Sequence, residues 1–148
     1  MIIDFATLIA TGASGVFRCD RPLPERALAF AAQQAVHVVP INLTAARDKN
    51  AFLNAVAKAL AFPEYFGHNW DAFYDCLLEL KQERGTLLVL REASGFARSE
   101  PEEFAAASAA LQDAADYWKS EGHPFAVVIE LEMAALAPEL PQVSLPAT

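Results

Sequence analysis

The chain has few of the features that mark secreted and membrane proteins. Its 148 residues include two cysteines, Cys19 and Cys76, too few for a disulfide framework, which indicates a reducing compartment. No stretch approaches the roughly 20 apolar residues that a membrane-spanning helix needs, and the first residues form no basic leader. We therefore expect a cytoplasmic protein.

Positive charge is also scarce. Eleven Lys and Arg stand against 19 Asp and Glu, the net charge is −8, and no cluster of basic residues offsets the excess. Phosphate backbones repel such a protein, so we expect no direct contact with nucleic acid. An acidic protein suits basic partners, and these include enzymes that themselves act on nucleic acids.

Catalytic motifs are missing as well. The sequence has no nucleophile elbow, no H-E-x-x-H motif and no phosphate-binding loop, and the glycines of residues 12–15 lack the spacing of a dinucleotide fingerprint. His37 and His123 are isolated in the sequence. The chain is therefore predicted to be no enzyme and to need no cofactor.

Hydrophobic residues are abundant: they make up 54% of the chain, which is enough to form a buried core. Apolar runs predict strands at residues 36–43, 86–90 and 125–131, and Pro40 suits an edge strand or a bulge because it has no N–H to donate. Asp48, Asn69 and Ser99 are expected to cap helices that run over 49–61, from 69 to 81 or 82, and over 101–120. Strands separated by helices predict a parallel sheet.

The chain is expected to divide into three parts. Residues 1–35 are predicted to form an extension, with a short strand at 15–19 and a helix at 24–34 packed on the core. That strand could pair beside residues 36–43. Residues 36–131 form the main domain, and residues 132–148 a short turn followed by a Pro-rich, frayed tail.

The segment Pro63–Leu77 carries the strongest functional signal. At about 100° per residue, Asp71, Asp75 and Glu79 form one acidic stripe along the predicted helix. The opposite face would pack inward through Ala72, Phe73, Cys76, Leu77 and Leu80. Aromatic residues crowd the same end of the helix: Tyr65, Phe66, Trp70 and Tyr74.

A charged helix face is most often only solvated, so this stripe needs further argument. It contains no interleaved lysine, and Asp71 and Asp75 repel each other at i,i+4, a small cost that stability alone would not favour. Aromatic side chains beside desolvatable charge are typical of interface hot spots. For Trp70 and Phe73 a core role remains a strong interpretation, because both lie on or near the buried arc of the predicted helix.

Metal binding is the weaker alternative for the same segment. His68, Asp71 and Asp75, with Glu64 as a fourth ligand, would make a metal-dependent hydrolase. The spacing is common by chance, however, and His68 precedes the helix. We expect no metal.

Residues 63–77, Pro-Glu-Tyr-Phe-Gly-His-Asn-Trp-Asp-Ala-Phe-Tyr-Asp-Cys-Leu, closely resemble the signature segment of the barstar family of ribonuclease inhibitors. The resemblance extends over residues 36–131, through Ile41-Asn42, the Leu-Ala-Phe-Pro run at 60–63, the Leu-Val-Leu run at 88–90 and Glu-Gly at 121–122. It implies an α/β, two-layer fold with helices packed on a three-stranded parallel sheet, to which the extension could add a fourth strand.

The resemblance also implies a function. Members of the family block the active site of a basic, barnase-like ribonuclease and protect the cell that makes it, as an antitoxin or immunity protein does. Asp75 would be the main anchor, in place of a substrate phosphate, and Asp71 a second acidic contact. Tyr65 and Gly67 match the loop that covers the catalytic histidine, Asn69 a capping and contact position, and Tyr74 a position where the family often has Trp. Together with Trp70 and Glu79, these residues form the predicted partner-binding set.

Three departures from the family pattern qualify this prediction. The acidic contact expected from the late helix falls at Tyr117, with Asp116 and Glu121 nearby. The loop at 82–86 is longer, and residues 1–35 have no counterpart. A barstar-like domain that binds a basic partner other than a nuclease is therefore the alternative function.

Overall fold

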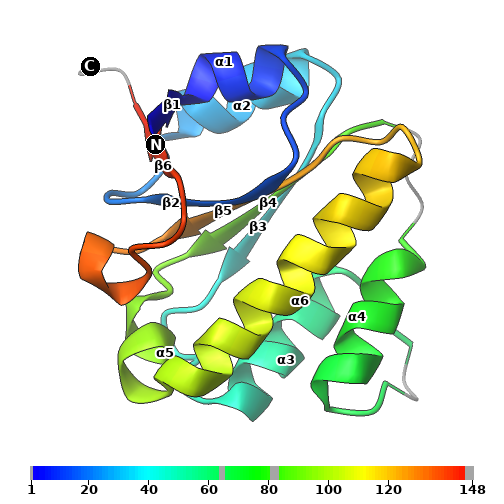
Figure 1. Ribbon diagram of the computed structural model, residues 1–148, viewed down its shortest axis with the longest axis vertical. Helices are drawn as coiled ribbons and strands as arrows, with labels where there is room; N and C mark the ends of the chain where they lie inside the picture. Colours follow the sequence, from blue (N-terminus) through cyan, green and yellow to red (C-terminus); the bar gives the residue numbers. More distant parts are fainter. Residues whose placement is uncertain (1, 64–65, 81–83, 146–148) are drawn as a thin grey trace.

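The computed structural model describes residues 2–63, 66–80 and 84–145 (Figure 1). Its centre is a six-stranded, all-parallel sheet in the order β1-β6-β2-β5-β4-β3. The strands are β1 (Ile2–Asp4), β2 (Gly15–Cys19), β3 (His37–Asn42), β4 (Thr86–Arg91), β5 (Phe125–Glu130) and β6 (Gln142–Ser144). The helices are α1 (Phe5–Ala10), α2 (Glu25–Gln33), α3 (Lys49–Ala59), α4 (Trp70–Leu78), α5 (Ser94–Ser99) and α6 (Pro101–Ser120), and a 3₁₀ turn, η1, covers Ala134–Leu136.

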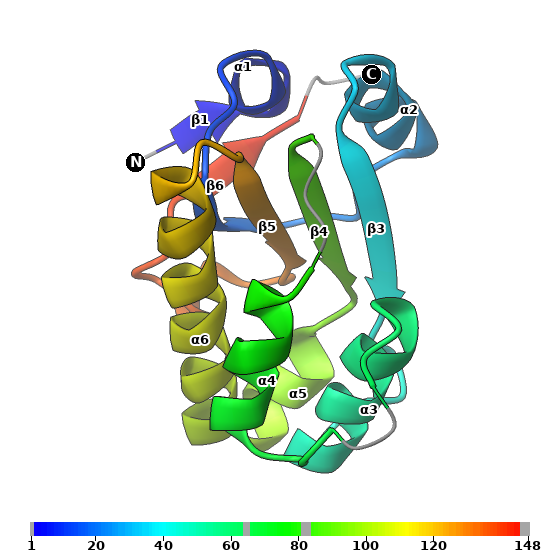
Figure 2. The same cartoon turned by 90° about the vertical axis from the view of Figure 1, so that its right-hand side faces the viewer.

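The two central strands explain why helices cover both faces of the sheet. Every residue of β5 and all but the last of β4 are buried. In β4, Leu88 and Leu90 pack into the core under α3, α4, α5 and α6, whereas Leu87 and Val89 pack into a second core under α1 and α2. Successive side chains of a strand point to opposite faces, so an unbroken apolar run needs a helix layer on each side. Figures 1 and 2 show the sheet between these two layers.

The predicted three-stranded, two-layer fold is therefore wrong in its extent. The order β5-β4-β3 does occur as a parallel unit, but it is half of a six-stranded sheet with a second helix layer. That second layer comes from α1 and α2, which lie within the first 35 residues. The buried runs at 86–90 and 125–131 already required a cover for their second face, and the two-layer prediction left that face open.

The strand expected from the extension is present, but its predicted neighbour is wrong. β2 pairs with β5, not with β3. β3 pairs only with β4 and forms the edge of the sheet, in agreement with the edge prediction for Pro40. Pro40 is itself exposed, and a strand with no N–H at this position suits an edge.

The expected frayed tail is partly ordered. β6 pairs with β1 over residues 142–144, and Arg18 of β2 holds the segment just before it. The Arg18 N–H donates to the Pro141 carbonyl at 2.9 Å, and its Nη1 donates to Gln142 Oε1 at 3.0 Å. A three-residue strand is too short to show a hydrophobic period, so no sequence pattern predicts it.

Several helix boundaries also differ from the predictions. α4 stops at Leu78, three or four residues short of the expected end at 81 or 82, and α5 occupies residues 94–99, where only a loop was expected. Ser99 does not cap α6, because its hydroxyl donates to the Arg47 carbonyl. Asp48 and Asn69 cap α3 and α4 as predicted. No helix in the described part of the chain is long and apolar enough to cross a membrane.

Candidate functional site

The loop before α4 is fixed by an aromatic anchor and a helix cap. Phe66 is buried, and its ring lies 5.3 Å from that of Phe62 and 4.9 Å from that of His68. The Asn69 side-chain oxygen accepts a hydrogen bond from the Ala72 N–H at 2.8 Å and so starts the helix. Gly67 is exposed between them. Tyr65 and Glu64, both named among the sequence predictions, lie outside the described residues.

The inner face of α4 is fully committed to the core. Phe73 and Leu77 are completely buried and Cys76 is 9% exposed. Rings of α3 and of the preceding loop surround Phe73, with Phe52 at 5.8 Å and Phe62 at 6.3 Å. Burial raises the pKa of the Cys76 thiol, and the nearby Glu79 and Asp75 carboxylates raise it further. This packing fixes the direction in which the outer face points.

The outer face of α4 presents three carboxylates to solvent. Asp71, Asp75 and Glu79 are all exposed, and none has an ion-pair partner among the described residues. Asp71 lies in the first turn, where a negative charge is favourable, whereas Asp75 and Glu79 lie at the carboxyl-terminal end, where it is not. A carboxylate kept exposed and unpaired has its full charge available to an outside partner.

Trp70 and Tyr74 are both half-buried beside these carboxylates. Trp70 Nε1 donates to Glu103 Oε2 of α6 at 3.1 Å, and the Trp70 ring lies 5.9 Å from that of Phe52. The Lys49 ammonium stands 5.8 Å from the centre of the same ring. Trp70 therefore connects α3, α4 and α6 and has a role in the fold. Its role in partner binding stays a prediction.

The carboxyl-terminal end of α4 is held by α6. Trp118 Nε1 donates to the Leu77 carbonyl, in the last turn of α4, at 3.0 Å. The Trp118 ring also lies 5.7 Å from that of His123. Trp118 was not among the predicted site residues. A Trp in the last turn of a long helix is a sequence signal for a contact with a neighbouring element.

Tyr117, not Asp116, borders α4. Because Glu103 and Trp118 face α4, the α4 side of α6 can be located, and at 100° per residue Tyr117 falls next to it. Asp116 falls about 100° further round. It is turned toward Gln112, whose Nε2 donates to its Oδ1 at 2.9 Å. The Tyr117 side chain is 38% exposed.

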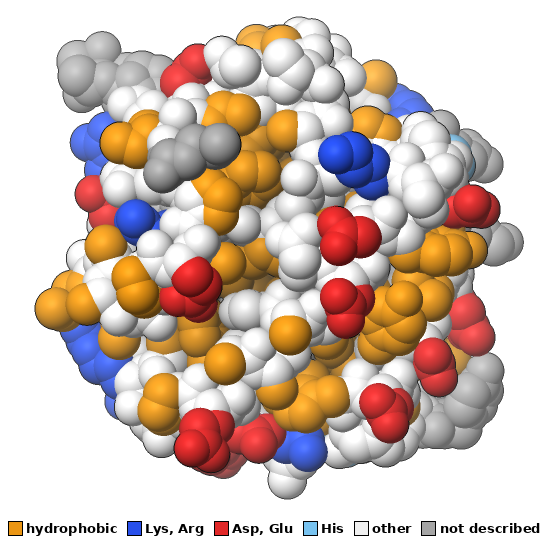
Figure 3. Space-filling model, in the orientation of Figure 1, with side chains coloured by type: hydrophobic (Ala, Val, Ile, Leu, Met, Phe, Trp, Pro, Cys, Tyr) orange, Lys and Arg blue, Asp and Glu red, His pale blue; other side chains and the backbone are white. Residues whose placement is uncertain are grey.

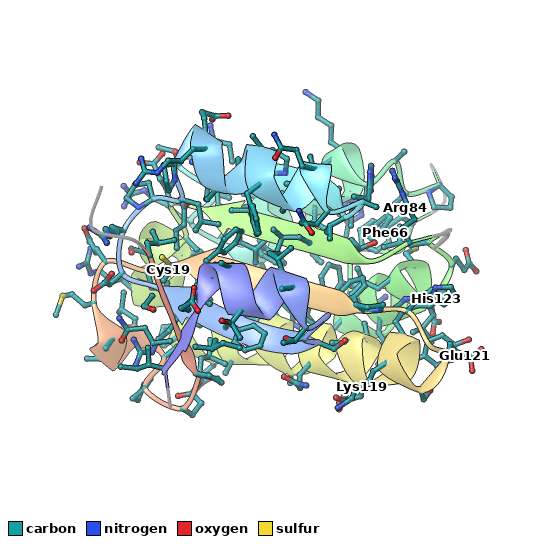
Figure 4. All side chains as sticks on the ribbon, turned by 90° about the horizontal axis from the view of Figure 1, so that it is seen from above. Cys19, Phe66, Arg84, Lys119, Glu121 and His123 are labelled. Atoms are coloured by element: carbon teal, nitrogen blue, oxygen red, sulfur yellow. The ribbon has the colours of Figure 1, made fainter. Side chains whose placement is uncertain are left out.

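Together these elements form one acidic surface, defined by Asp71, Asp75 and Glu79 of α4 with Tyr74 and Tyr117 at its border. Figure 2 places α4 toward the viewer with α6 beside it, and Figure 3 shows acidic side chains over α6 and α4 with hydrophobic side chains between them. In Figure 4, Phe66 and His123 lie on the right-hand side of the molecule, the side on which Figure 1 shows α4.

Among the described residues, no group of three or more His, Cys, Asp or Glu side chains is arranged so that it could hold a metal ion. His68 is instead engaged with Asn54, since its Nε2 lies 2.6 Å from Asn54 Oδ1. Asp71 and Asp75 remain on the solvent side of α4.

Comparison with known proteins gives a family and a fold. The model of the family described as Barstar (barnase inhibitor) matches residues 36–130, which is more than half of the chain. No curated protein matches the sequence.

Among solved structures, the ADP form of the Aeropyrum pernix ORC2 protein aligns with a TM-score of 0.57 and 10% identity, over 95% of this chain and 45% of that one. The same protein in ADPNP-ADP complexes aligns with a TM-score of 0.56 and 10% identity, over 95% of this chain and 44% of that one. The chain thus spans less than half the length of these structures, and the likeness concerns the fold alone. It covers nearly the whole six-stranded architecture, which again argues against a sheet of three strands.

Proposed function

Because the chain belongs to the barstar family, we propose that it inhibits a basic ribonuclease by inserting the acidic surface of α4 into the enzyme's active site. The family is one of inhibitors, and catalysis by this chain forms no part of the proposal. The protein would act in the cytoplasm as an antitoxin or immunity protein.

The observation that carries the proposal is the exposure of Asp71 and Asp75 without ion-pair partners among the described residues. A ribonuclease active site binds phosphates with basic side chains, and two carboxylates on a rigid helix can occupy the same positions. Asp75 would be the main anchor and Asp71 the second contact. Tyr65, Gly67, Asn69, Trp70, Tyr74 and Glu79 would complete the interface.

The net negative charge should also raise the rate at which the protein associates with a basic enzyme. At −8, the protein attracts a basic enzyme over distances of about 10 Å in ordinary salt. Complementary fields of this kind raise association rates by roughly 10–10³-fold, an effect that falls steeply with ionic strength. We expect the association rate to fall with added salt much more than the dissociation rate changes.

The direct test compares two carboxylates of the same helix. Asp75→Ala is expected to weaken inhibition of a cognate basic ribonuclease by about 2–5 kcal/mol, a magnitude already known for charged interface contacts, the barnase–barstar pair included. Glu79→Ala should cost much less, because Glu79 lies beyond the last turn of α4. Inhibition constants from titrated ribonuclease assays measure both.

Glu139→Ala is the matched control, since it removes the same charge from an exposed loop residue outside the acidic surface. Equal, small losses for Asp75→Ala and Glu79→Ala would refute the assigned roles. The proposed function would be refuted if the protein inhibited no basic ribonuclease, including any that is encoded beside this gene.

A second candidate is a basic partner that is not a nuclease. The observation in its favour is that an exposed tyrosine, Tyr117, occupies the position where the family can supply an acidic contact. A pull-down from the source cell with wild type and with the Asp71→Ala, Asp75→Ala double variant separates the two candidates. Capture of a basic non-nuclease that the double variant loses would favour the second.

A further inference from the structure

A pocket of about 480 Å³ lies at the carboxyl ends of the central strands, away from the acidic surface. Its lining comes from the segments that directly follow β2, β3, β4 and β5, and includes Arg21, Thr44, Arg47, Ser94, Arg98 and Glu130. Ligands of open parallel sheets bind in crevices at this edge. The volume falls within the range of about 300–1,000 Å³ typical of small-molecule sites.

The pocket and α4 lie on different sides of the molecule. In Figure 1, α5, which borders the pocket, lies to the left of α6 and α4 lies to its right. Figure 4 likewise shows Cys19, the last residue of β2, on the side opposite Phe66 and His123. A ligand here would leave the acidic surface open.

Arginines concentrate at this pocket. The chain has seven, and three of them line it: Arg21, Arg47 and Arg98. A fourth, Arg91, supports the wall, since its Nε lies 3.7 Å from Glu130 Oε2 and its Nη2 donates to the Leu23 carbonyl at 2.7 Å. Four carboxylates, Asp20, Glu92, Glu130 and Glu132, share the same lining, so the availability of each arginine depends on how these carboxylates are engaged.

The carboxylates of the wall are largely engaged by the protein itself. Glu130 is 4% exposed, and its two oxygens accept hydrogen bonds from the N–H groups of Leu23 and Glu92 at 2.9 and 3.2 Å. Glu132 pairs with Arg98, and Glu92 accepts from the Thr44 hydroxyl. Of the acidic side chains that line the pocket, only Asp20, at its exposed rim, has no hydrogen-bond or ion-pair partner among the described residues.

Arg47 is positioned but unpaired. Its side chain crosses the first turn of α5 above Gly95, where an added Cβ would lie 3.5 Å from Arg47 Cγ and 3.6 Å from Cζ. Its carbonyl accepts the Ser99 hydroxyl, which fixes the base of the residue. The guanidinium has no hydrogen-bond or ion-pair partner among the described residues. A planar guanidinium held in this way presents several N–H donors in a geometry that matches carboxylate or phosphate.

We propose that this pocket binds a small molecule through a phosphate or carboxylate group, with Arg47 as the principal contact. The Ser94 hydroxyl, which accepts from the Glu132 N–H at 3.0 Å, keeps its own proton free to donate to the same group. Arg98, on the same wall, is already paired with Glu132, which leaves Arg47 as the arginine available to the ligand. The site is separate from the acidic surface and does not depend on inhibition of a ribonuclease.

The test uses the whole protein with two probes, inorganic phosphate and succinate, each titrated at constant ionic strength against sodium chloride. Backbone amide resonances are followed by NMR. We expect at least one probe to shift the Ser94 and Gly95 amides along a saturable curve, and to leave the amides of Asp71 and Asp75 unmoved. The probe that binds identifies phosphate or carboxylate as the preferred group.

Three variants decide whether Arg47 is the cause. Arg47→Ala is expected to weaken the saturable binding at least tenfold, and Arg47→Lys at least threefold, because Lys keeps the charge but loses the planar fork. Arg26→Ala, an exposed position on α2 across the sheet, should bind as wild type does. Unchanged amide dispersion verifies that each variant folds.

The proposal is overturned if neither probe gives a saturable shift at Ser94 and Gly95. It is equally overturned if Arg47→Ala binds as tightly as wild type, or if Arg26→Ala loses as much affinity as Arg47→Ala. Each of these outcomes would mean that the pocket attracts anions no better than the rest of the surface.

Discussion

At the scale of single residues, the region around α4 shows that one side chain can serve both the fold and a surface. Trp70 was open to both interpretations in the sequence, and the structure gives it a hydrogen bond to Glu103 and ring contacts with Phe52 and Phe73. No pattern in the sequence could reveal these contacts, because Glu103 lies 33 positions away on a helix whose placement depends on the whole sheet. The contact role of Trp70 stays a prediction.

The hydrogen bond of Trp70 can be tested on its own. Trp70→Phe keeps most of the ring but removes the Nε1–H, so we expect the free energy of unfolding to fall by about 1–2 kcal/mol. Urea unfolding followed by circular dichroism measures it. Glu103→Gln keeps an acceptor for the indole and should cost less. If both variants unfold as wild type does, the bond contributes nothing to stability.

Cys19 gives the protein a pH dependence on the alkaline side. Burial raises the pKa of its thiol above the ordinary value of 9.0, and the Asp20 and Glu130 carboxylates raise it further. The folded state therefore keeps this proton at a pH where the unfolded chain releases it. The resulting stability is complete below about pH 9 and is lost as the pH rises through the folded pKa.

We accordingly expect Cys19→Ala to flatten the decline of the unfolding free energy between pH 8 and pH 10.5. Cys76, whose thiol pKa is raised for the same main reason, should add to the effect in the double variant. Denaturant unfolding at a series of pH values provides the measurement. The same slope in wild type and both variants would contradict this account.

At the scale of elements, α4 illustrates how much of a functional site a sequence can predict. The N-cap at Asn69, the buried face through Phe73, Cys76 and Leu77, and the exposed acidic stripe all follow from 3.6-residue periodicity and capping chemistry, and the structure has each of them. The predicted end of the helix was three or four residues too late. Short elements such as α5, β1 and β6 were missed altogether, since they are too brief to display a period.

The two aspartates of α4 should affect stability in opposite directions. Asp75→Asn removes the repulsion from Asp71 and a negative charge near the carboxyl-terminal end of the helix, so we expect about 0.3–1 kcal/mol of added stability at low salt. Asp71→Asn relieves the same repulsion but gives up a favourable charge in the first turn, so it should be neutral or slightly destabilising.

Thermal unfolding at low and high salt measures both aspartate variants, and salt should shrink the difference between them. A stabilising Asp75→Asn that also weakens inhibition would identify Asp75 as a residue kept for binding at the expense of stability. Destabilisation by Asp75→Asn would show that the carboxylate has a structural partner.

At the scale of the whole molecule, the first 35 residues matter most. The sequence predicts that they form an extension packed on a domain at 36–131, and that division remains a prediction. In the structure, Phe5, Leu8 and Leu28 cover the face of the sheet formed by Leu87, Val89 and Val128. All six of these side chains are at least 91% buried. The family match begins at residue 36, so it leaves out the segment that covers this face.

Deletion of residues 1–35 tests this directly. The deletion exposes the second core and removes β2 from between β6 and β5, so we expect an aggregating or molten product that binds a hydrophobic dye strongly. Circular dichroism, dye fluorescence and size-exclusion chromatography report the outcome. A monomeric, cooperatively folding product would contradict the expectation and support the original division.

The pairing of β1 with β6 has a consequence for how the molecule is made. β1 is synthesised long before its partner strand β6, and β2 likewise waits for β5. The ribosome must therefore release nearly 140 further residues before the opening strand finds its place. The apolar residues of α1 that follow β1 stay uncovered until β4 and β5 have emerged, so folding on the ribosome should be late, and a nascent-chain chaperone would have a long interval in which to act.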